Sequence, residues 1–248
     1  MFEDFNLRNK DKYYLVFLIL FSSILVMHYI NFNMKVGVQC SDVYIYLLNA
    51  LHFTGAEIQS TEYFYISPLI CFLTSLLFRL GLVDRIAIYI VTGAIAIIGN
   101  VGLYLLLRQY YDENLSMAGT IIYSTLTLNL TWLANGTLDV PAVGMTIWFV
   151  LFTVIAIDKN PKFYRYAIIL AVVGFFTRYT FILTVPALLL YYVYRKGFKI
   201  DSTDWKYIKQ GILIGVVLAI IILAVVLIMG HGQFGVATQM AKGISGKQ

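Results

Sequence analysis

The sequence predicts an all-α polytopic membrane protein with about seven transmembrane helices and additional juxtamembrane helices in an outer loop. Three observations support this fold class. Of the 248 residues, 60% are hydrophobic and only 12% are charged, and several apolar runs are long enough to cross a bilayer. Soluble domains carry about 25% charged residues. The composition therefore excludes a cytosolic enzyme, a secreted disulfide scaffold and a disordered chain.

The predicted spans follow from the length of the apolar runs, because a bilayer core about 30 Å thick needs roughly 20 helical residues. The fifth qualifying run is short and meets the sixth at Arg178, so the boundary between these two runs stays open. The runs are Tyr13–Ile30, Ile86–Leu107, Leu115–Leu133, Val140–Ile157, Tyr166–Thr177, Tyr179–Tyr194 and Ile208–Met229. Asn31-Phe32-Asn33 follows the first run in place of a small-residue cleavage site, so this run is expected to be a signal anchor.

An eighth apolar run, Tyr63–Leu80, is interrupted by Pro68 and several hydroxyl residues, and the basic residues indicate that it does not span. Cytoplasmic loops are enriched in Lys and Arg. Most of the 18 basic residues fall on the cytoplasmic side only if this run stays outside the bilayer. We therefore predict a multi-pass protein of the cell membrane with a cytoplasmic amino terminus. Residues 31–85 then form one outer loop, with helices near 41–55 and 63–80.

The chain is expected to form one domain, because it contains no repeat and no low-complexity tract. Residues 1–12 form the cytoplasmic amino terminus, residues 13–230 the membrane module and residues 231–248 a glycine-rich polar tail. The net charge of +5 is explained by basic residues on the cytoplasmic side, so no nucleic-acid partner is expected. Membrane lipid is the expected surrounding.

Asp42 is the first candidate for a functional residue, because ionisable groups at the edge of a membrane are costly to place there. In a helix that starts at Ser41, Asp42 shares one face with Tyr46, Asn49 and Phe53. An acid, a phenol and an amide on one stripe are suited to a hydroxyl-rich ligand. The alternative is a carboxylate that only favours the helix dipole.

Asp139 lies where the fourth span begins, on the same outer side as Asp42. Pro141 suits the first turn of a helix, so Asp139 is either a simple N-cap or part of a site. In the second case Asp42 and Asp139 converge on an acceptor hydroxyl or on a divalent metal ion. Sequence distance does not decide between these alternatives.

Arg178 is flanked by apolar residues on both sides. It either reaches out to phosphate headgroups of the membrane or clamps the phosphate of a bound lipid, for which the guanidinium fork is well shaped. The chain lacks the GxxxxGK[ST] motif of nucleotide-driven pumps and the HExxH motif of zinc hydrolases.

The order of the motifs carries a family resemblance. Asp42 opens a helix in the first outer loop, a helix led by Pro68 follows, and two short motifs come later in the chain. These motifs are Thr137-Leu138-Asp139-Val140-Pro141 and Phe176-Thr177-Arg178-Tyr179-Thr180. Residues 10–230 resemble the membrane module of the GT-C superfamily, glycosyltransferases that use polyprenyl-phosphate-linked sugars. The resemblance is strongest to the protein O-mannosyltransferase and aminoarabinose-transferase branch.

The resemblance implies a hexosyltransferase that moves a sugar from a polyprenyl-phosphate donor to a protein or lipid acceptor at the outer membrane face. Asp42 would be the general base, and Arg178 would stabilise the leaving phosphate. Tyr46 matches a frequent aromatic of that family and would contact substrate. Asp139 would orient the acceptor or share a divalent metal ion with Asp42; no other cofactor is implied.

Three departures from the family pattern keep an alternative open. Val43 occupies the position of a second acid. Ile66-Ser67 stands where some relatives place a lysine that grips the donor phosphate, and the chain ends at Gln248, where relatives continue. A truncated product, a fragment and a minimal module completed by a partner subunit therefore all remain open. The competing function is an inactive or incomplete GT-C-like module, or a non-enzymatic lipid-handling or transport protein. Transport is disfavoured, because the ionisable residues cluster at the outer boundary and no inverted repeat is found.

Overall fold

The structure is a computed structural model that describes residues 5, 7–37, 40–57 and 66–229. This part of the chain is all-helical, as predicted, without a strand. Its α-helices are α1 (Asn9–Val36), α2 (Ser41–His52), α3 (Pro68–Arg79), α4 (Ile86–Leu107), α5 (Glu113–Thr125), α6 (Thr127–Ala134), α7 (Asp139–Asp158), α8 (Tyr164–Thr177), α9 (Thr184–Lys196) and α10 (Ser202–Met229). Two short 3₁₀ helices, η2 (Pro161–Phe163) and η3 (Tyr179–Leu183), flank α8.

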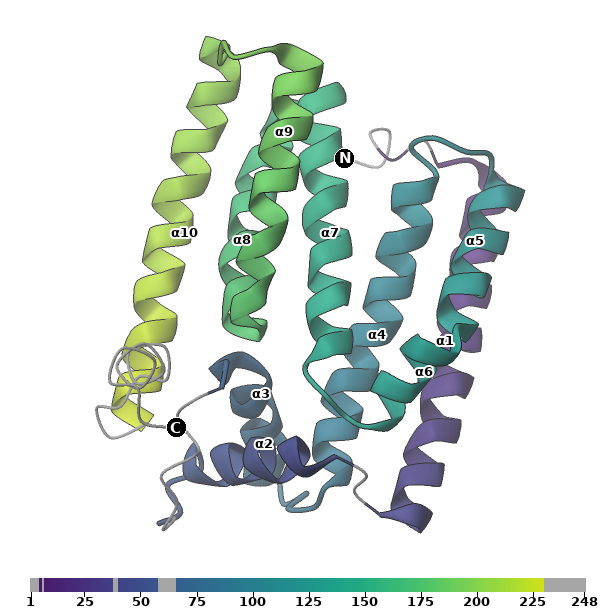
Figure 1. Cartoon of the computed structure of the whole chain (residues 1–248), viewed down its shortest axis with the longest axis vertical. Helices are drawn as coiled ribbons and strands as arrows, with labels where there is room; N and C mark the ends of the chain where they lie inside the picture. Colours follow the sequence, from purple (N-terminus) through teal and green to yellow (C-terminus); the bar gives the residue numbers. More distant parts are fainter. Residues whose placement is uncertain (1–4, 6, 38–39, 58–65, 230–248) are drawn as a thin grey trace, which may run out of the picture.

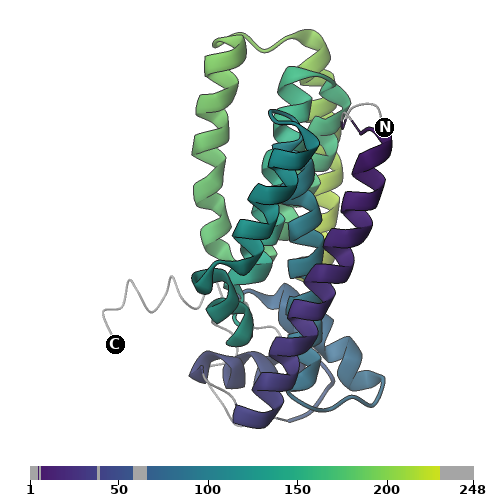
Figure 2. The same ribbon diagram turned by 90° about the vertical axis from the view of Figure 1, so that its right-hand side faces the viewer.

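The long helices stand side by side and alternate in direction (Figure 1 and Figure 2). One end of the bundle, here called the amino-terminal end, holds the start of α1 and the turns before α5, α8 and α10. The opposite end, here called the α2–α3 end, holds α2, α3 and the turns before α7 and α9. This alternation is the one that the seven-span prediction requires.

Four helices in the described part are long and apolar enough to cross a membrane: α1, α4, α7 and α10. The bounds of α4 coincide with the predicted run Ile86–Leu107. The helices α8 and α9 have only 14 and 13 residues. With the adjoining η2 and η3, however, they rise about 27 Å and about 30 Å, close to the thickness of a bilayer core. A count of seven spans stays a prediction.

Two predicted boundaries are wrong. The first helix continues through Asn31-Phe32-Asn33 to Val36, and the loop begins only at Gly37, whose φ of 97° ends the helix. The predicted span Leu115–Leu133 is broken at Leu126 into α5 and α6. At the end of α5, Ser124 and Thr125 donate their hydroxyls to carbonyls one turn back. Such bonds compete with the helical backbone and favour a bend.

The two outer-loop helices are shorter than predicted. The helix α2 ends at His52, and the turn after it closes at Gly55, whose φ is 95°. Pro68 is the first residue of α3, a position that needs no backbone N–H donor. The start of the predicted helix 63–80 and the tail 231–248 lie outside the described residues.

The centre of the bundle is the contact between α4 and α7, where two glycines meet. A Cβ added to Gly99 would lie 2.9 Å from the Cα of Gly144. Small residues allow helix backbones to approach closely in membranes. The start of α7 and the loop before α4 are therefore fixed relative to each other at the α2–α3 end.

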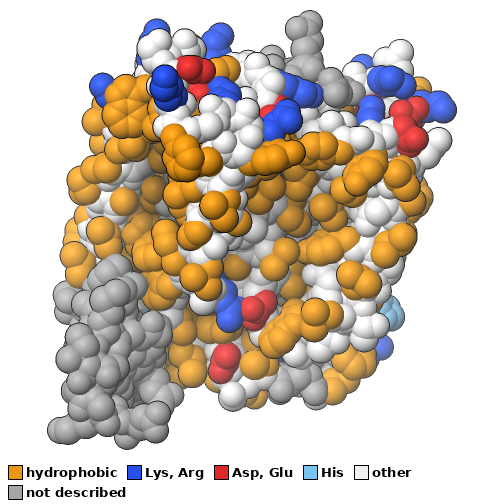
Figure 3. All heavy atoms as spheres, turned by 45° about the horizontal axis from the view of Figure 1, so that its top comes forward, with side chains coloured by type: hydrophobic (Ala, Val, Ile, Leu, Met, Phe, Trp, Pro, Cys, Tyr) orange, Lys and Arg blue, Asp and Glu red, His pale blue; other side chains and the backbone are white. Residues whose placement is uncertain are grey.

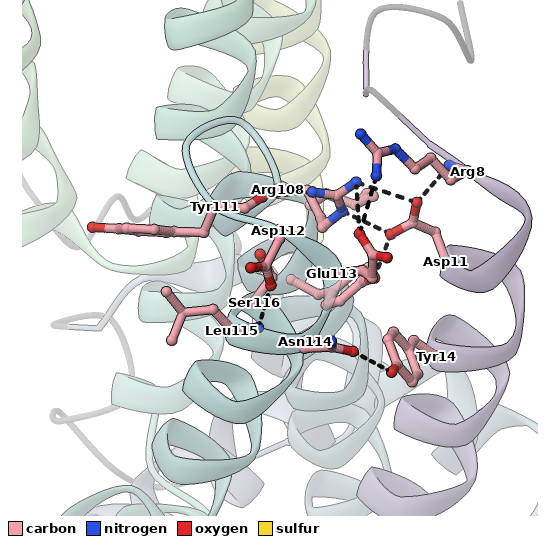
Figure 4. A network of polar contacts seen from close by, with 12 residues as sticks. Arg8, Asp11, Tyr14, Arg108, Tyr111, Asp112, Glu113, Asn114, Leu115 and Ser116 are labelled. Atoms are coloured by element: carbon pink, nitrogen blue, oxygen red, sulfur yellow. Dashed lines mark hydrogen bonds and ion pairs between the residues drawn. The ribbon is translucent and has the colours of Figure 1, made fainter.

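Charged side chains gather at the amino-terminal end, above a broad hydrophobic surface (Figure 3). Figure 4 shows part of this group, in which fully buried Asp11 accepts bonds from the Tyr104 hydroxyl and from Nε of Arg108, the latter at 2.7 Å. Arg108 also donates to the carbonyl of Tyr111 at 2.5 Å. Because a buried charge is tolerated only when it is paired, this network fixes α1 against α4.

Candidate functional site

A cavity of about 230 Å³ lies at the α2–α3 end of the bundle. Four regions meet there: α2, the start of α3, the start of α7, and the break between α8 and α9. The lining residues are Tyr46, Ile66, Ser67, Leu138, Arg178, Tyr179 and Thr180. Two of the predicted site residues, Tyr46 and Arg178, therefore face the same space although they are far apart in the sequence.

Arg178 owes its place to the break in the helical hairpin. Its backbone is extended (φ −156°, ψ 126°), between the end of α8 and the start of η3. Its N–H donates to the carbonyl of Gly174 at 2.9 Å, and its own carbonyl accepts from the N–H of Phe181 at 2.9 Å. Non-helical backbone at membrane depth is tolerated where it lines a cavity. The structure places the shared boundary of the fifth and sixth predicted runs at Arg178.

Asp139 forms an ion pair with Arg178. It is the first residue of α7, and the cap position before it is occupied by Leu138, so the interpretation of Asp139 as an N-cap is wrong. The side chains of Asp139 and Arg178 are 34% and 37% exposed, so solvent screens their attraction. The pair leaves both groups accessible to a ligand entering from the membrane surface.

Tyr46 gives the cavity a neutral hydroxyl. Its side chain is buried, as are those of Asn49 and of Phe53, the residue after α2, whereas Asp42 on the same predicted stripe is exposed. Burial raises the pKa of Tyr46 well above its ordinary value, and the charge of Asp42 raises it further, while Arg178 acts in the opposite direction. Tyr46 is therefore a protonated donor at neutral pH.

Asp42 is exposed in the first turn of α2, one turn before Tyr46. Its negative charge contributes to the raised pKa of Tyr46. Asp42 is not, however, among the residues that line the cavity. Within the described ranges no ion pair or hydrogen bond joins Asp42 to Asp139. Those ranges also contain no group of three or more His, Cys, Asp or Glu side chains that could hold a metal ion. Since Asp139 is engaged by Arg178, a metal ion shared by the two acids stays a prediction.

The structure adds a contact that the sequence does not predict. The backbone N–H of Tyr179 donates to the hydroxyl of Ser67 at 3.1 Å, and the Tyr179 hydroxyl donates to the carbonyl of Ile66 at 3.3 Å. Ser67 directly precedes Pro68. A serine before a proline at the start of a helix is the feature of the sequence that could have drawn attention to Ser67. The contact ties the segment that carries Arg178 to the amino terminus of α3, an end that favours anions.

The comparisons with known proteins bear on this site. A family model described as dolichyl-phosphate-mannose-protein mannosyltransferase matches residues 66–229. The match covers more than half of the chain, including Ser67, Asp139 and Arg178, and it leaves out Asp42 and Tyr46. The comparison with curated proteins and the comparison with solved structures give no match.

Proposed function

The chain belongs to the dolichyl-phosphate-mannose-protein mannosyltransferase family, membrane glycosyltransferases that use polyprenyl-phosphate-linked sugars, and from this premise we propose its specific reaction. It transfers a hexose from a polyprenyl phosphate to a hydroxyl or amine acceptor at the membrane face that carries α2 and α3. That face is the outer one, and the amino terminus is cytoplasmic. The observation that carries the proposal is the cavity in which Arg178, Ser67 and Tyr46 meet.

The donor phosphate binds between Arg178 and the amino terminus of α3. A guanidinium can hold two phosphate oxygens with a planar pair of N–H groups. The amino terminus of a helix adds unpaired backbone N–H groups and a partial positive charge. Because Ser67 lies at this terminus and lines the cavity with Arg178, both sources of positive potential act on the same space.

In the transfer step, the acceptor oxygen or nitrogen attacks the anomeric carbon while the bond from that carbon to the phosphate oxygen breaks. The polyprenyl phosphate leaves with the bonding electron pair, and Arg178 stabilises the charge that develops on it. Asp42 takes the proton of the acceptor, which requires its carboxylate to come within about 3 Å of the attacking atom. A single displacement inverts the configuration of the sugar.

Asp139 and Tyr46 position the reactants. Asp139 holds the guanidinium of Arg178 at the edge of the cavity. Once the donor phosphate has replaced Asp139 as the partner of Arg178, the carboxylate of Asp139 orients the acceptor. Tyr46 donates a hydrogen bond from its neutral hydroxyl. The acceptor is a protein or a lipid that reaches the exposed side of α2, where Asp42 lies.

A second function, donor binding without transfer, is favoured by the position of Val43. This residue stands where related enzymes carry a second acid, yet its side chain is 0% exposed and packs in a cluster with Ile70 and Cys71. A chain with one acid in this helix would still bind a lipid-linked sugar through Arg178. It would then serve as a donor-binding module of a larger enzyme.

One experiment separates the two functions. The full chain is placed in lipid nanodiscs with radiolabelled sugar on polyprenyl phosphate, and both donor binding and transfer are measured. We expect Asp42→Asn to abolish transfer and to keep donor binding. The matched control is Glu57→Gln, which removes another exposed carboxylate after α2.

The outcomes distinguish the two functions. Transfer lost only in Asp42→Asn supports the transferase. Donor binding without transfer in the unaltered chain supports the donor-binding module. Neither binding nor transfer by correctly folded protein overturns both.

A further inference from the structure

Tyr179 joins the break between α8 and α9 to the start of α3 by two hydrogen bonds. Its backbone N–H donates to Oγ of Ser67 at 3.1 Å, and its hydroxyl donates to the carbonyl of Ile66 at 3.3 Å. The helices α3 and α8 are in contact, and Figure 1 shows the end of α8 next to α3. The two bonds therefore hold two successive residues against the segment that carries Arg178.

The hydroxyl of Ser67 does not serve the helix that it precedes. Serine is a favoured N-cap residue because its oxygen accepts a backbone N–H of the first turn. Ser67 holds the N-cap position of α3, yet its side chain forms no capping hydrogen bond. Its oxygen accepts from Tyr179 instead. The direction of the Ser67 hydroxyl is thus set by another part of the chain, and the first N–H groups of α3 have no side-chain cap.

The hydrogen of the Ser67 hydroxyl is available to a ligand. A serine hydroxyl has one hydrogen and two lone pairs, so the bond accepted from Tyr179 leaves the hydrogen unused. Among the described residues this hydrogen donates to no acceptor. Ser67 is only 4% exposed, and it lines the cavity. Because a buried donor without an acceptor is unfavourable, an acceptor atom inside the cavity is favoured.

The chemistry of the cavity selects an anionic acceptor. Arg178 is the cation among the described lining residues, which otherwise carry hydroxyls and apolar groups. This lining contains no carboxylate, since Asp139 pairs with Arg178 from outside it. The oxygens of one phosphate can accept from a guanidinium and from a hydroxyl at the same time. A phosphate bound to Arg178 therefore brings acceptor atoms to the unused hydrogen of Ser67.

Tyr179 sets the relative position of these two groups. It follows Arg178 directly in the chain, so the guanidinium and the Ser67 hydroxyl lie on either side of the same pair of hydrogen bonds. The ring of Tyr179 packs against the ring of Phe175, one turn earlier, with the centroids 5.2 Å apart. Two bonds and a ring contact restrict rotation as well as separation. Binding groups that are held in place beforehand lose less freedom when a ligand arrives.

We propose that Ser67 is a binding residue for the donor phosphate and that Tyr179 is the positioning residue that directs its hydroxyl. The inference rests on the proposed function, because it adds a ligand contact to the same site. Ser67 donates its hydroxyl hydrogen to an oxygen of the phosphate that Arg178 holds. Both interactions strengthen as the bond to the sugar breaks, because negative charge then grows on the departing phosphate.

The test compares two lipids with the same polyprenyl chain, polyprenyl phosphate and the uncharged polyprenol. Each is titrated in radiolabelled form into the full chain in nanodiscs, with empty nanodiscs subtracted and thermal unfolding measured in parallel. We expect Ser67→Ala to weaken binding of polyprenyl phosphate roughly tenfold, the effect of losing one hydrogen bond to a charged group. Binding of polyprenol should not change, because it has no phosphate to accept the bond. Ser67→Thr keeps the hydroxyl and should bind polyprenyl phosphate like the unaltered chain.

Tyr179→Phe tests the positioning role. It removes the bond to the carbonyl of Ile66 but keeps the ring and the backbone N–H. The affinity for polyprenyl phosphate should fall, by less than in Ser67→Ala, while the affinity for polyprenol stays unchanged; a merely structural effect would lower both. The matched control is Tyr44→Phe, which removes the hydroxyl of an exposed tyrosine in α2 and should leave both affinities unchanged.

Four results would overturn the inference. Unchanged phosphate affinity in Ser67→Ala, or a Ser67→Thr variant as weak as Ser67→Ala, would remove the hydroxyl from the site and leave Arg178 as the phosphate ligand. An equal loss of affinity for both lipids in Tyr179→Phe would make Tyr179 a support of the fold alone. An unaltered chain that binds the two lipids equally would leave no phosphate site, and only this result would overturn the proposed function as well.

Discussion

The ion pair between Arg178 and Asp139 allows the proposed donor site to be tested by a double-mutant cycle. The pair is about two thirds buried on each side, and screening limits its contribution to folding stability to about 0.5–1 kcal/mol. A charge-assisted bond from Arg178 to the donor phosphate is worth about 1.5–3 kcal/mol. Arg178→Gln should therefore cost little stability but weaken binding of polyprenyl phosphate by roughly 10- to 150-fold.

Asp139→Asn should have the opposite effect on the donor. Without the carboxylate, Arg178 no longer has to leave its partner before it binds phosphate. Affinity should stay equal or rise by up to about fivefold, the equivalent of the screened ion pair. The double variant should bind the donor as weakly as Arg178→Gln alone, because the effect of Asp139 acts through the arginine.

The assay is titration of polyprenyl phosphate into the full chain in nanodiscs, with thermal unfolding measured in parallel. Lys35→Gln serves as the control, because it removes an exposed cation at the same end of the bundle. Donor affinity that is unchanged by Arg178→Gln would refute the phosphate-clamp reasoning. An Asp139→Asn variant that binds as weakly as Arg178→Gln would refute it as well, since Asp139 would then contact the donor itself.

Three further changes test the packing around the site. Val43→Asp should destabilise the fold by at least about 3 kcal/mol, because it buries a carboxylate without a partner; a stable variant with increased transfer would contradict the assignment of Val43 to the core. Gly144→Val should cost about 1–3 kcal/mol of stability through overpacking, because a Cβ there already lies 3.2 Å from the carbonyl oxygen of Ile95; unchanged thermal unfolding would contradict the close contact of α4 and α7. Burial raises the pKa of Tyr46 above its ordinary 10.0, so above pH 10 the unfolded chain loses a proton that the folded chain keeps, and stability falls. Tyr46→Phe should lessen this fall, and identical pH profiles of stability for variant and unaltered chain would argue against a buried phenol.

The helices were predictable where hydrophobicity alone decides them. The run from Ile86 to Leu107 is bounded by arginines on both sides, and α4 has the same bounds. The break at Leu126 was not predictable from hydropathy, because it depends on hydroxyl bonds to the backbone at the end of α5. Arg178 was found as a boundary because two short apolar runs meet there.

Two of the predicted residues, Tyr46 and Arg178, line the cavity, but the contacts around it could not be predicted. Asp139 and Arg178 stand out as charges beside apolar runs, yet their pairing depends on how α7 and α8 pack. The contact between Ser67 and Tyr179 involves a backbone N–H, a group that every non-proline residue possesses, so residue type gave no direct sign of it. The roles of Asp42, Asp139, Arg178 and Tyr46 in transfer stay predictions.

The turn at Arg178 also bears on how the chain is inserted during synthesis. The arms before and after the turn, α8 and α9, are each short, and the residue between them carries a charge that resists entry into the lipid. Asp139 precedes Arg178 in the chain and is therefore synthesised first. When the hairpin of α8 and α9 enters the bilayer, the arginine can meet a carboxylate that is already present at that face. The order of synthesis thus gives Arg178 a partner before the cavity around it is complete.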